Sequence, residues 1–166
     1  MSTAREWIKR LELEKHPEGG YYRETFRARG GIALPDRFGG PRAYSTAIYF
    51  LITPAEFSCL HRLASDETWH FYTGSPLALR AITPDGARKE IKLGPDFAND
   101  QRFQATIGAG NWFGAKLLED TPGAFALVGC TLAPGFEFSD FELARRADLT
   151  RIYPQHANFI REMTRS

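Results

Sequence analysis

The chain has 166 residues, of which 43% are hydrophobic and 25% are charged, and its 21 Lys and Arg nearly balance its 20 Asp and Glu. This length and composition are typical of one globular domain with a hydrophobic core, so we expect a single domain over residues 1–166. A formal charge of +1 offers no excess of basic residues such as nucleic-acid binding draws on, and we expect no nucleic-acid partner.

Targeting and redox signals are weak. Residues 1–15 contain no apolar segment of the kind found in secretory signals, and the apolar run 47–52 is far shorter than the roughly 20 residues that span a bilayer. We therefore expect no membrane association and a cytoplasmic location. The two cysteines, Cys59 and Cys130, lie in apolar runs, where a buried free thiol is commoner than a disulfide in a chain without an export signal.

The N-terminal third begins with a helix and continues as a strand. Thr3 and Glu6 form a capping-box pattern, and the apolar spacing that follows predicts a short amphipathic helix over 4–12. The segment 16–20, His-Pro-Glu-Gly-Gly, predicts a turn. In residues 21–29 the side chains alternate as in a β-strand, which would place the arginines 23, 27 and 29 together on one face. This face is either exposed to solvent or binds an anion such as a phosphate or carboxylate.

From residue 44 onward, the chain repeats short β-branched and aromatic runs separated by turn residues. The predicted strands are 44–52, 56–63, 66–73, 76–83, 87–93, 103–108, 112–119, 124–133 and 136–143. Strands at this spacing favour a sandwich or barrel over alternating βα units. At the C-terminus, Phe159, Ile160 and Met163 form one apolar stripe and predict a final helix.

One motif stands out between Ser58 and Gly74. His61, Leu63, Glu67 and Gly74 occupy the spacing H-x-H-(x3)-E-(x6)-G, with leucine at the second histidine position. This pattern resembles the first motif of the cupin superfamily. The second cupin motif ends P-x-G-x-x-H, and the similar segment 108–113 here ends in Phe113 instead of histidine.

Further stretches resemble the Cupin-5 (DUF985-type) branch of that superfamily. They are residues 16–25, 57–58, 66–67, 69–71, 110–115 and 129–138, which together with the motif cover nearly the whole chain. The resemblance implies an all-β fold, a double-stranded β-helix (the cupin jelly-roll barrel), here with short N- and C-terminal helices. It also implies a homodimer, because such barrels commonly pair through their N-terminal strands.

The resemblance bears directly on metal binding. Metal-binding cupins typically use two histidines and a glutamate from the first motif and a histidine from the second, and only His61 and Glu67 remain of these four. Two protein ligands fall short of the three usual in a catalytic zinc site, so we expect no metal and no cofactor. A regular strand would put Cys59 on the face of His61, which leaves a Cys, His and Glu trio as an alternative, and would turn His70 to the opposite face.

Three functional interpretations of the His61–Glu67 pair stay open. His61 is a candidate general base, steadied by Glu67, as in metal-free cupins that resemble nucleotide-sugar epimerases. The pair is equally a candidate for non-catalytic ligand contact, or for a purely structural hydrogen bond. An epimerase also needs an acid, commonly a tyrosine, and the strand residues Tyr49 and Tyr72 are better placed for this than the loop tyrosines.

Our favoured prediction is a barrel cavity that binds a small polar ligand, a sugar or nucleotide-sugar. The alternatives are a metal-free sugar isomerase or epimerase with His61 and Glu67 as catalytic residues, and a non-catalytic structural or storage-like barrel. The residues predicted to contact the ligand are His61, Leu63, Glu67, Trp69, Phe71, Gln104 and Phe113.

Overall fold

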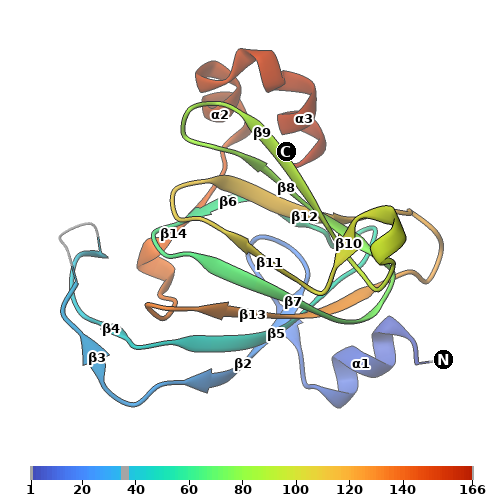
Figure 1. Cartoon of the computed structure of the whole chain (residues 1–166), viewed down its shortest axis with the longest axis horizontal. Coiled ribbons are helices and arrows are strands. Elements are labelled where there is room, and N and C mark those ends of the chain that lie inside the picture. Colours follow the sequence, from blue (N-terminus) through green and yellow to red (C-terminus); the bar gives the residue numbers. More distant parts are fainter. Residues whose placement is uncertain (1, 35–37, 166) are drawn as a thin grey trace.

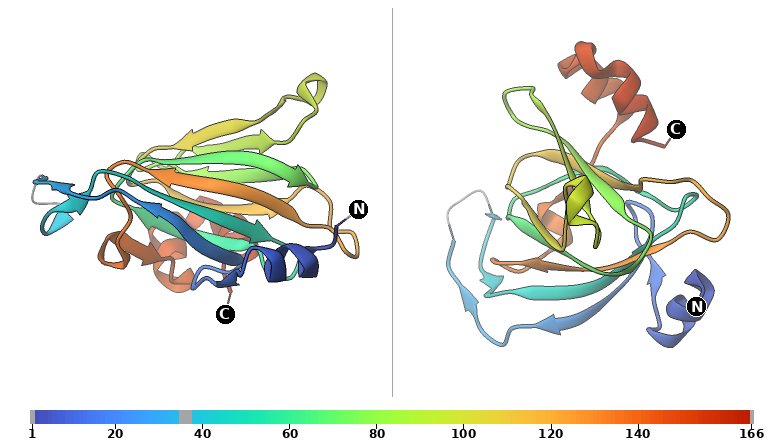
Figure 2. Two further views of the ribbon diagram at one scale, coloured as in Figure 1. Left: turned by 90° about the horizontal axis from the view of Figure 1, so that it is seen from below. Right: turned by 45° about the vertical axis from the view of Figure 1, so that its right-hand side comes forward.

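The protein is a sandwich of two six-stranded β-sheets that face each other (Figures 1 and 2). The computed structural model describes residues 2–34 and 38–165. The first sheet has the order β1-β2-β5-β13-β7-β11. Its strands are β1 (Glu14–Lys15), β2 (Tyr21–Arg27), β5 (Thr46–Ile52), β13 (Ala126–Leu132), β7 (Glu67–Gly74) and β11 (Gln104–Ile107).

The second sheet has the order β10-β9-β8-β12-β6-β14. Its strands are β10 (Gln101–Arg102), β9 (Arg88–Leu93), β8 (Leu77–Ile82), β12 (Trp112–Leu117), β6 (Ser58–Leu63) and β14 (Phe141–Leu143). A short outer hairpin joins β3 (Gly31–Ile32) to β4 (Arg42–Ala43), and a 3-10 turn, η2 (Phe97–Asn99), follows β9.

Strands that are distant in the sequence are neighbours in each sheet. In the first sheet β13 lies between β5 and β7, and in the second β12 lies between β8 and β6, all antiparallel. This alternation of consecutive strands between two sheets is the jelly-roll arrangement. The predicted all-β jelly roll with short terminal helices is confirmed.

A short helix at the N-terminus covers part of the outer face of the first sheet. Helix α1 (Ala4–Arg10) begins with the predicted capping box, in which Thr3 and Glu6 each accept a backbone hydrogen bond from the other. Its apolar side, with Trp7 and Ile8, packs on Leu51 and Leu127, which face outward from the sheet. This burial explains why a helix of two turns is stable here.

The C-terminal helices cover the outer face of the second sheet (Figure 1). They are α2 (Arg146–Ile152), the 3-10 turn η4 (Pro154–His156) and α3 (Ala157–Glu162). Phe159 and Ile160 belong to a buried cluster with Leu60 and Ile82 of the sheet. Among the described residues, no helix is long and apolar enough to cross a membrane.

One predicted strand is only partly present. Residues 136–143 were expected as a single strand, but they form the 3-10 turn η3 (Phe138–Asp140) followed by the short strand β14. Side-chain hydrogen bonds hold this turn in place of the backbone hydrogen bonds of a strand. Arg42 donates to both carboxylate oxygens of Asp140, each at 2.7 Å.

The space between the sheets differs from one half to the other. In the half bounded by β8, β9, β11 and β12, which we call the filled half, inward-facing side chains such as Leu79, Leu93, Ile107 and Phe113 are fully packed. The other half lies between β2, β5 and β6 and is closed by the turn 16–20 and by residues 136–138. This part, the open half, contains a cavity.

Candidate functional site

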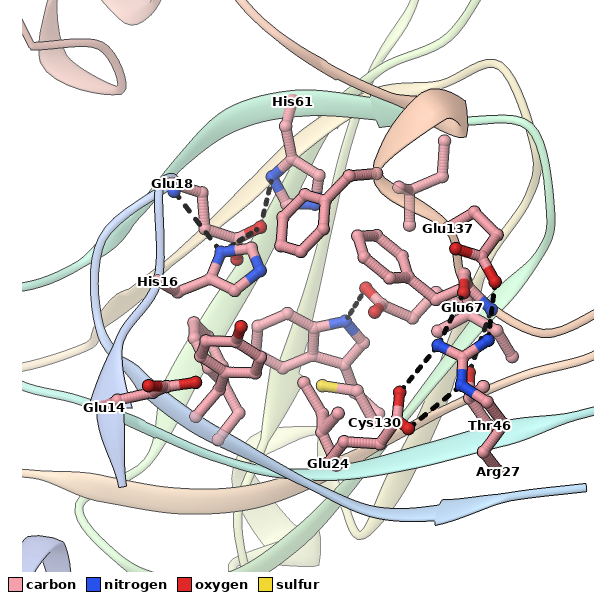
Figure 3. A pocket seen from close by; sticks show the side chains of 18 residues that line it. Glu14, His16, Glu18, Glu24, Arg27, Thr46, His61, Glu67, Cys130 and Glu137 are labelled. Atoms are coloured by element: carbon pink, nitrogen blue, oxygen red, sulfur yellow. Dashed lines mark hydrogen bonds and ion pairs between the residues drawn. The ribbon is translucent and has the colours of Figure 1, made fainter. Parts of the chain in front are cut away.

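The cavity in the open half has a volume of about 160 Å³ (Figure 3). Both sheets contribute to its wall. Its deep end holds His61 and Leu63 from β6, together with Glu67 and Trp69 from β7. Its mouth is formed by charged residues of β2 and by residues 136–138. Polar groups inside a mostly apolar pocket are the usual pattern of a ligand site.

A β-bulge in β6 sets which side chains point inward. His61 pairs with Phe113, but Ala115 pairs with Ser58, so two residues of β6 stand opposite Gly114 alone. Gly114 is needed here, because a Cβ would lie 2.5 Å from the carbonyl oxygen of Ser58. The bulge therefore keeps His61 facing the cavity while placing Ser58, instead of Cys59, on the inner side.

The turn after β1 brings a second histidine and a second buried carboxylate to the cavity. In Figure 3, His16 and Glu18 lie against His61, and Glu18 Oε2 is 3.4 Å from Nδ1 of each histidine. The turn is pressed onto the sandwich, since a Cβ on Gly19 would meet the carbonyl oxygen of Phe57 at 2.2 Å. Ser58 Oγ donates to Glu18 Oε1 at 2.7 Å and completes the contact between turn and strand.

His61 is held in one orientation. It is 1% exposed, and its Nδ1 donates to the carbonyl oxygen of Cys59 at 2.9 Å. Because a carbonyl only accepts, this bond places the proton on Nδ1 and leaves a lone pair on Nε2. Burial lowers the pKa of His61, with the Glu67 carboxylate opposing this effect. The imidazole is therefore neutral near pH 7 and presents an acceptor to the cavity.

Glu67 is the acid at the deep end. It is 7% exposed, and one of its carboxylate oxygens accepts a hydrogen bond from Trp69 Nε1 at 2.7 Å. The pKa of Glu67 is raised to about 7, mainly by burial; His61 and the hydrogen bond from Trp69 lower it, and the nearby Glu18 raises it. Burial likewise raises the pKa of Glu18 and lowers that of His16. Burial thus favours the protonated form of both carboxyl groups beside the histidines.

The mouth carries an ion-pair cluster produced by another bulge. In the pairing of β2 with β5, Thr25 is an extra residue, so Phe26 turns outward and Arg27 turns inward beside Glu24. The predicted grouping of Arg27 with Arg23 and Arg29 on one face is therefore wrong. Arg27 donates to both oxygens of Glu24, at 3.0 and 2.8 Å, and to Glu137 at 2.7 Å.

The predicted ligand contacts divide into two groups. His61, Leu63, Glu67 and Trp69 all line the cavity, and their binding of a ligand stays a prediction. Phe71 does not line it, because it lies one step further along β7, opposite Val128 and against the packed core.

Phe113 was also expected in the cavity wall. It lies beside His61, with ring centroids 4.2 Å apart, but its ring is packed in the filled half and does not line the cavity. The imidazole of His61 packs against the ring of Phe113. The prediction that Phe113 meets the ligand directly is therefore wrong.

Gln104 is on the outer face of the first sheet, and its predicted place in the cavity is wrong. In β11 the inward positions are Ala105 and Ile107, so Gln104 points outward, where its amide nitrogen lies 3.0 Å from His70 Nδ1. His70 in turn contacts Thr131 at 2.9 Å. The strand alternation of β7 is regular here, which places His70 opposite to Glu67 as predicted.

The structure places Cys130, and not Cys59, in the wall of the cavity. The bulge in β6 removes Cys59 from the cavity, where its predicted sharing of a face with His61 would have placed it. Cys130 of β13 lines the cavity instead, and burial raises the pKa of its thiol well above the usual value. Both cysteines are free and buried.

The side chains at the usual cupin ligand positions do not fit a metal ion. Leu63 and Phe113 carry no donor atom, which leaves only His61 and Glu67 of the four usual ligands. Within residues 2–34 and 38–165, no group of three or more His, Cys, Asp or Glu side chains is arranged to hold a metal.

Sequence reasoning missed several residues of the cavity. His16 and Glu18 come from a segment that was interpreted only as a turn. Glu24 and Arg27 come from a strand that was treated as regular, without the bulge at Thr25. A signal for the first pair was present, since a histidine and a glutamate flank a proline directly before two glycines. No signal in the sequence indicated the bulge at Thr25 in β2.

Comparison with known proteins agrees with this geometry. Residues 5–144 match the family Cupin_5, described as Cupin superfamily (DUF985). The chain belongs to the Cupin_5 family. A relative of this Cupin_5 protein is the uncharacterized protein YML079W of Saccharomyces cerevisiae, which is 27% identical over 157 residues, or 89% of this chain and 78% of the relative.

Solved structures match the Cupin_5 chain over nearly its full length. Protein SO0799 from Shewanella oneidensis is 38% identical, with a TM-score of 0.89 over 99% of both chains. A hypothetical protein from Leishmania major is 37% identical, with a TM-score of 0.93 over 99% of this chain and 100% of that one.

A more distant likeness concerns the fold alone. Oxalate decarboxylase from Bacillus subtilis is 11% identical, with a TM-score of 0.54 over 90% of this chain and 36% of that chain. Fold similarity at this level carries no reaction with it, because function depends on the residues of the site.

Proposed function

We propose that this protein binds a small polar ligand of monosaccharide size in the cavity of its open half. The observation that carries this proposal is a pair of acceptor atoms that are open to the cavity. Nε2 of His61 and the second carboxylate oxygen of Glu67 have no hydrogen-bond partner among the described residues, and neither atom is sealed from the cavity. An occupant that supplies donors can reach both atoms, which suits the site better than a barrel with a purely structural role.

The size of the cavity supports a ligand of one ring. A cavity of about 150 Å³ holds a benzene molecule, and drug-sized ligands occupy roughly 300 Å³ or more. The cavity here, at about 160 Å³, matches a pyranose ring and is too small for a whole nucleotide-sugar. A sugar is therefore a better occupant than its nucleotide derivative.

A second candidate function is metal-free isomerisation or epimerisation of a sugar. The fixed Nδ1–H of His61 leaves a basic Nε2 in the cavity, which is the arrangement of a general base. In such a reaction His61 would take a proton from the carbon next to a carbonyl, and an acid would return one to the sugar, with no net change of composition. Tyr22 lines the cavity, whereas the tyrosines favoured from the sequence, Tyr49 and Tyr72, contact each other away from it.

A ligand screen with two matched histidine variants tests the binding proposal. Monosaccharides and amino sugars are titrated into the wild type, His61→Ala and His70→Ala, with binding followed by calorimetry and by crystal soaks. We expect His61→Ala to weaken binding about fivefold or more, since one hydrogen bond contributes about 1 kcal/mol or more. His70 lies outside the cavity, so His70→Ala should bind like the wild type.

The outcomes separate the candidates. Binding that is equal in His61→Ala and the wild type, or ligand density outside the cavity, would contradict the proposal. The same sugars incubated in D₂O test the catalytic alternative, because proton abstraction exchanges carbon-bound hydrogen even when no net product forms. Exchange that is lost in His61→Ala supports catalysis, and binding without exchange shows a binding protein.

A further inference from the structure

The charged side chains around the cavity are strongly unequal in sign. Five glutamates line it against a single arginine, and both histidines have lowered pKa values. The glutamates are Glu14, Glu18, Glu24, Glu67 and Glu137. The cavity is therefore acidic although the whole chain is nearly neutral.

The one arginine is not available to a ligand. Arg27 donates to Glu24 through two nitrogens, to Glu137 at 2.7 Å and to the carbonyl oxygen of Phe136 at 3.1 Å. A guanidinium has five N–H donors, and these four bonds engage it in the plane where it would meet a phosphate or carboxylate. An anionic ligand would thus face carboxylates without a free cation among the described lining residues.

The deep end presents two acceptor atoms that are open to the cavity and have no protein partner. Glu67 is 7% exposed and His61 is 1% exposed, yet each keeps one acceptor atom without a partner. Figure 3 shows Glu67 and His61 directed toward the space between them. A ligand at this point has to bring N–H or O–H donors, and a positive charge would also compensate the buried carboxylates.

Aromatic rings form much of the remaining wall. Tyr22, Phe50 and Trp69 line the cavity from the first sheet, and Phe136 and Phe138 line it from the loop. The faces of such rings attract cations, and the attraction grows when water is excluded. Aromatic walls around buried carboxylates are a combination that favours an organic cation over a neutral or anionic ligand.

We propose that the ligand carries a protonated primary amine, which lies between Glu67 and the aromatic wall with His61 Nε2 as a second acceptor. The proposal rests on the binding function proposed above and specifies its ligand class: a ring-sized organic cation, such as an amino sugar or a cyclic amine. The ammonium group supplies three donors, enough for both unpaired acceptors and one further oxygen.

Proton linkage gives this proposal a signature of its own. The groups that face Glu67 are His61 from β6, Glu18 from the turn, and Cys130 from β13. The pKa of the Cys130 thiol is also raised, well above its usual value, so this thiol stays protonated near pH 7. The two carboxyl groups have raised pKa values that a cation would lower, since it favours their ionised forms. Binding of a cation near pH 7 therefore releases protons, whereas binding of a neutral ring does not.

The test uses two matched pairs of probes. Cyclohexylammonium is compared with cyclohexanol, and glucosamine with glucose near pH 6.5, by calorimetry and by NMR titration of the folded protein. We expect each amine to bind at least about tenfold more tightly than its neutral partner. Because Glu67 titrates at about 7, the affinity for cyclohexylammonium, which stays protonated, should rise about tenfold from about pH 6 to about pH 8.

Two variants test whether the negative charge of Glu67 causes the preference for an amine. Glu67→Gln keeps the shape of the side chain and should lose at least about tenfold in affinity for cyclohexylammonium, with less than about a twofold change for cyclohexanol. Glu142→Gln removes the same charge from a surface pair with Arg62 and should bind as the wild type does. Thermal melting confirms that both variants are folded.

Each result decides between the two proposals. Glucose and glucosamine binding equally would overturn the cation and leave the sugar-sized ligand standing. Cyclohexylammonium binding without either sugar would support the cation and contradict the sugar. Failure of all four probes to bind the folded wild type would overturn both. An amine preference that persists in Glu67→Gln would overturn the role of Glu67.

Discussion

The filled half and the open half of the sandwich are built from the same strand pattern, yet one is packed solid and the other holds a cavity. In the filled half, inward positions of β8 and β12 carry Leu79, Ala81, Phe113 and Ala115. In the open half, the corresponding positions on β2 and β6 carry Glu24, Arg27 and His61. Glu24 and Arg27 are exposed at the mouth, so His61 is the buried polar group of these three, and we expect the packing of the filled half to offset the cost of its burial.

The largest expected effect comes from removing an aromatic ring in the filled half. Phe113→Ala should lower the free energy of unfolding by about 3–5 kcal/mol, because it deletes a buried ring and leaves a void beneath His61. Urea denaturation measures this change. The matched variant Phe138→Ala, at the half-exposed mouth, should cost less than about 1 kcal/mol. Equal losses in the two variants would contradict the division into halves.

A second effect concerns the buried acid of the open half. The folded-state pKa of Glu67, about 7, lies above its ordinary value of 4.5, so the wild type loses stability as the pH rises through this interval. Glu67→Gln removes that loss. Relative to the wild type, the variant should gain about 3 kcal/mol in unfolding free energy between about pH 4 and about pH 8.

The measurement is urea denaturation across this pH range. Glu142→Gln is the control, and its curve should run parallel to that of the wild type, because Glu142 is exposed. A Glu67→Gln curve that also runs parallel would show that Glu67 is ionised without penalty in the folded protein, and that the open half is more hydrated than its burial indicates.

The smallest effect is expected at the mouth. Arg27→Gln removes the ion pairs with Glu24 and Glu137, and these side chains are more than a third exposed. We expect a change of about 1 kcal/mol or less in unfolding free energy, because exposed pairs are screened by solvent. A larger loss would mean that the cluster closes the open half structurally, and thermal denaturation at two salt concentrations would reveal it.

Much of this site was predictable from short-range pattern. The motif spacing predicted that His61 and Glu67 enter the cavity together, and the period-2 alternation placed Trp69 beside Glu67 and turned His70 away. These predictions succeeded because β7 is regular over Glu67–Phe71, where every residue has one partner on β13.

The failures have equally local causes. Alternation carried through Thr25 put Arg27 on the wrong face, and alternation carried through β6 put Cys59 inside, because an extra residue shifts all later side chains by one position. The prediction for Gln104 was wrong because it assigned an outward-facing residue of β11 to the inner side of the sheet.

By itself, the sequence determined the class of fold, the family, and the position of the site on two strands. The fold class follows from periodicity, the family from resemblances over nearly the whole chain, and the position of the site from a motif of 17 residues. Only the tertiary structure decided which polar groups meet there. The turn carrying His16 and Glu18 reaches His61 across more than 40 residues of chain, and Arg27 meets Glu137 across 110. Such contacts depend on bulges and on the packing of the two sheets, and the local pattern of residues predicts neither of these.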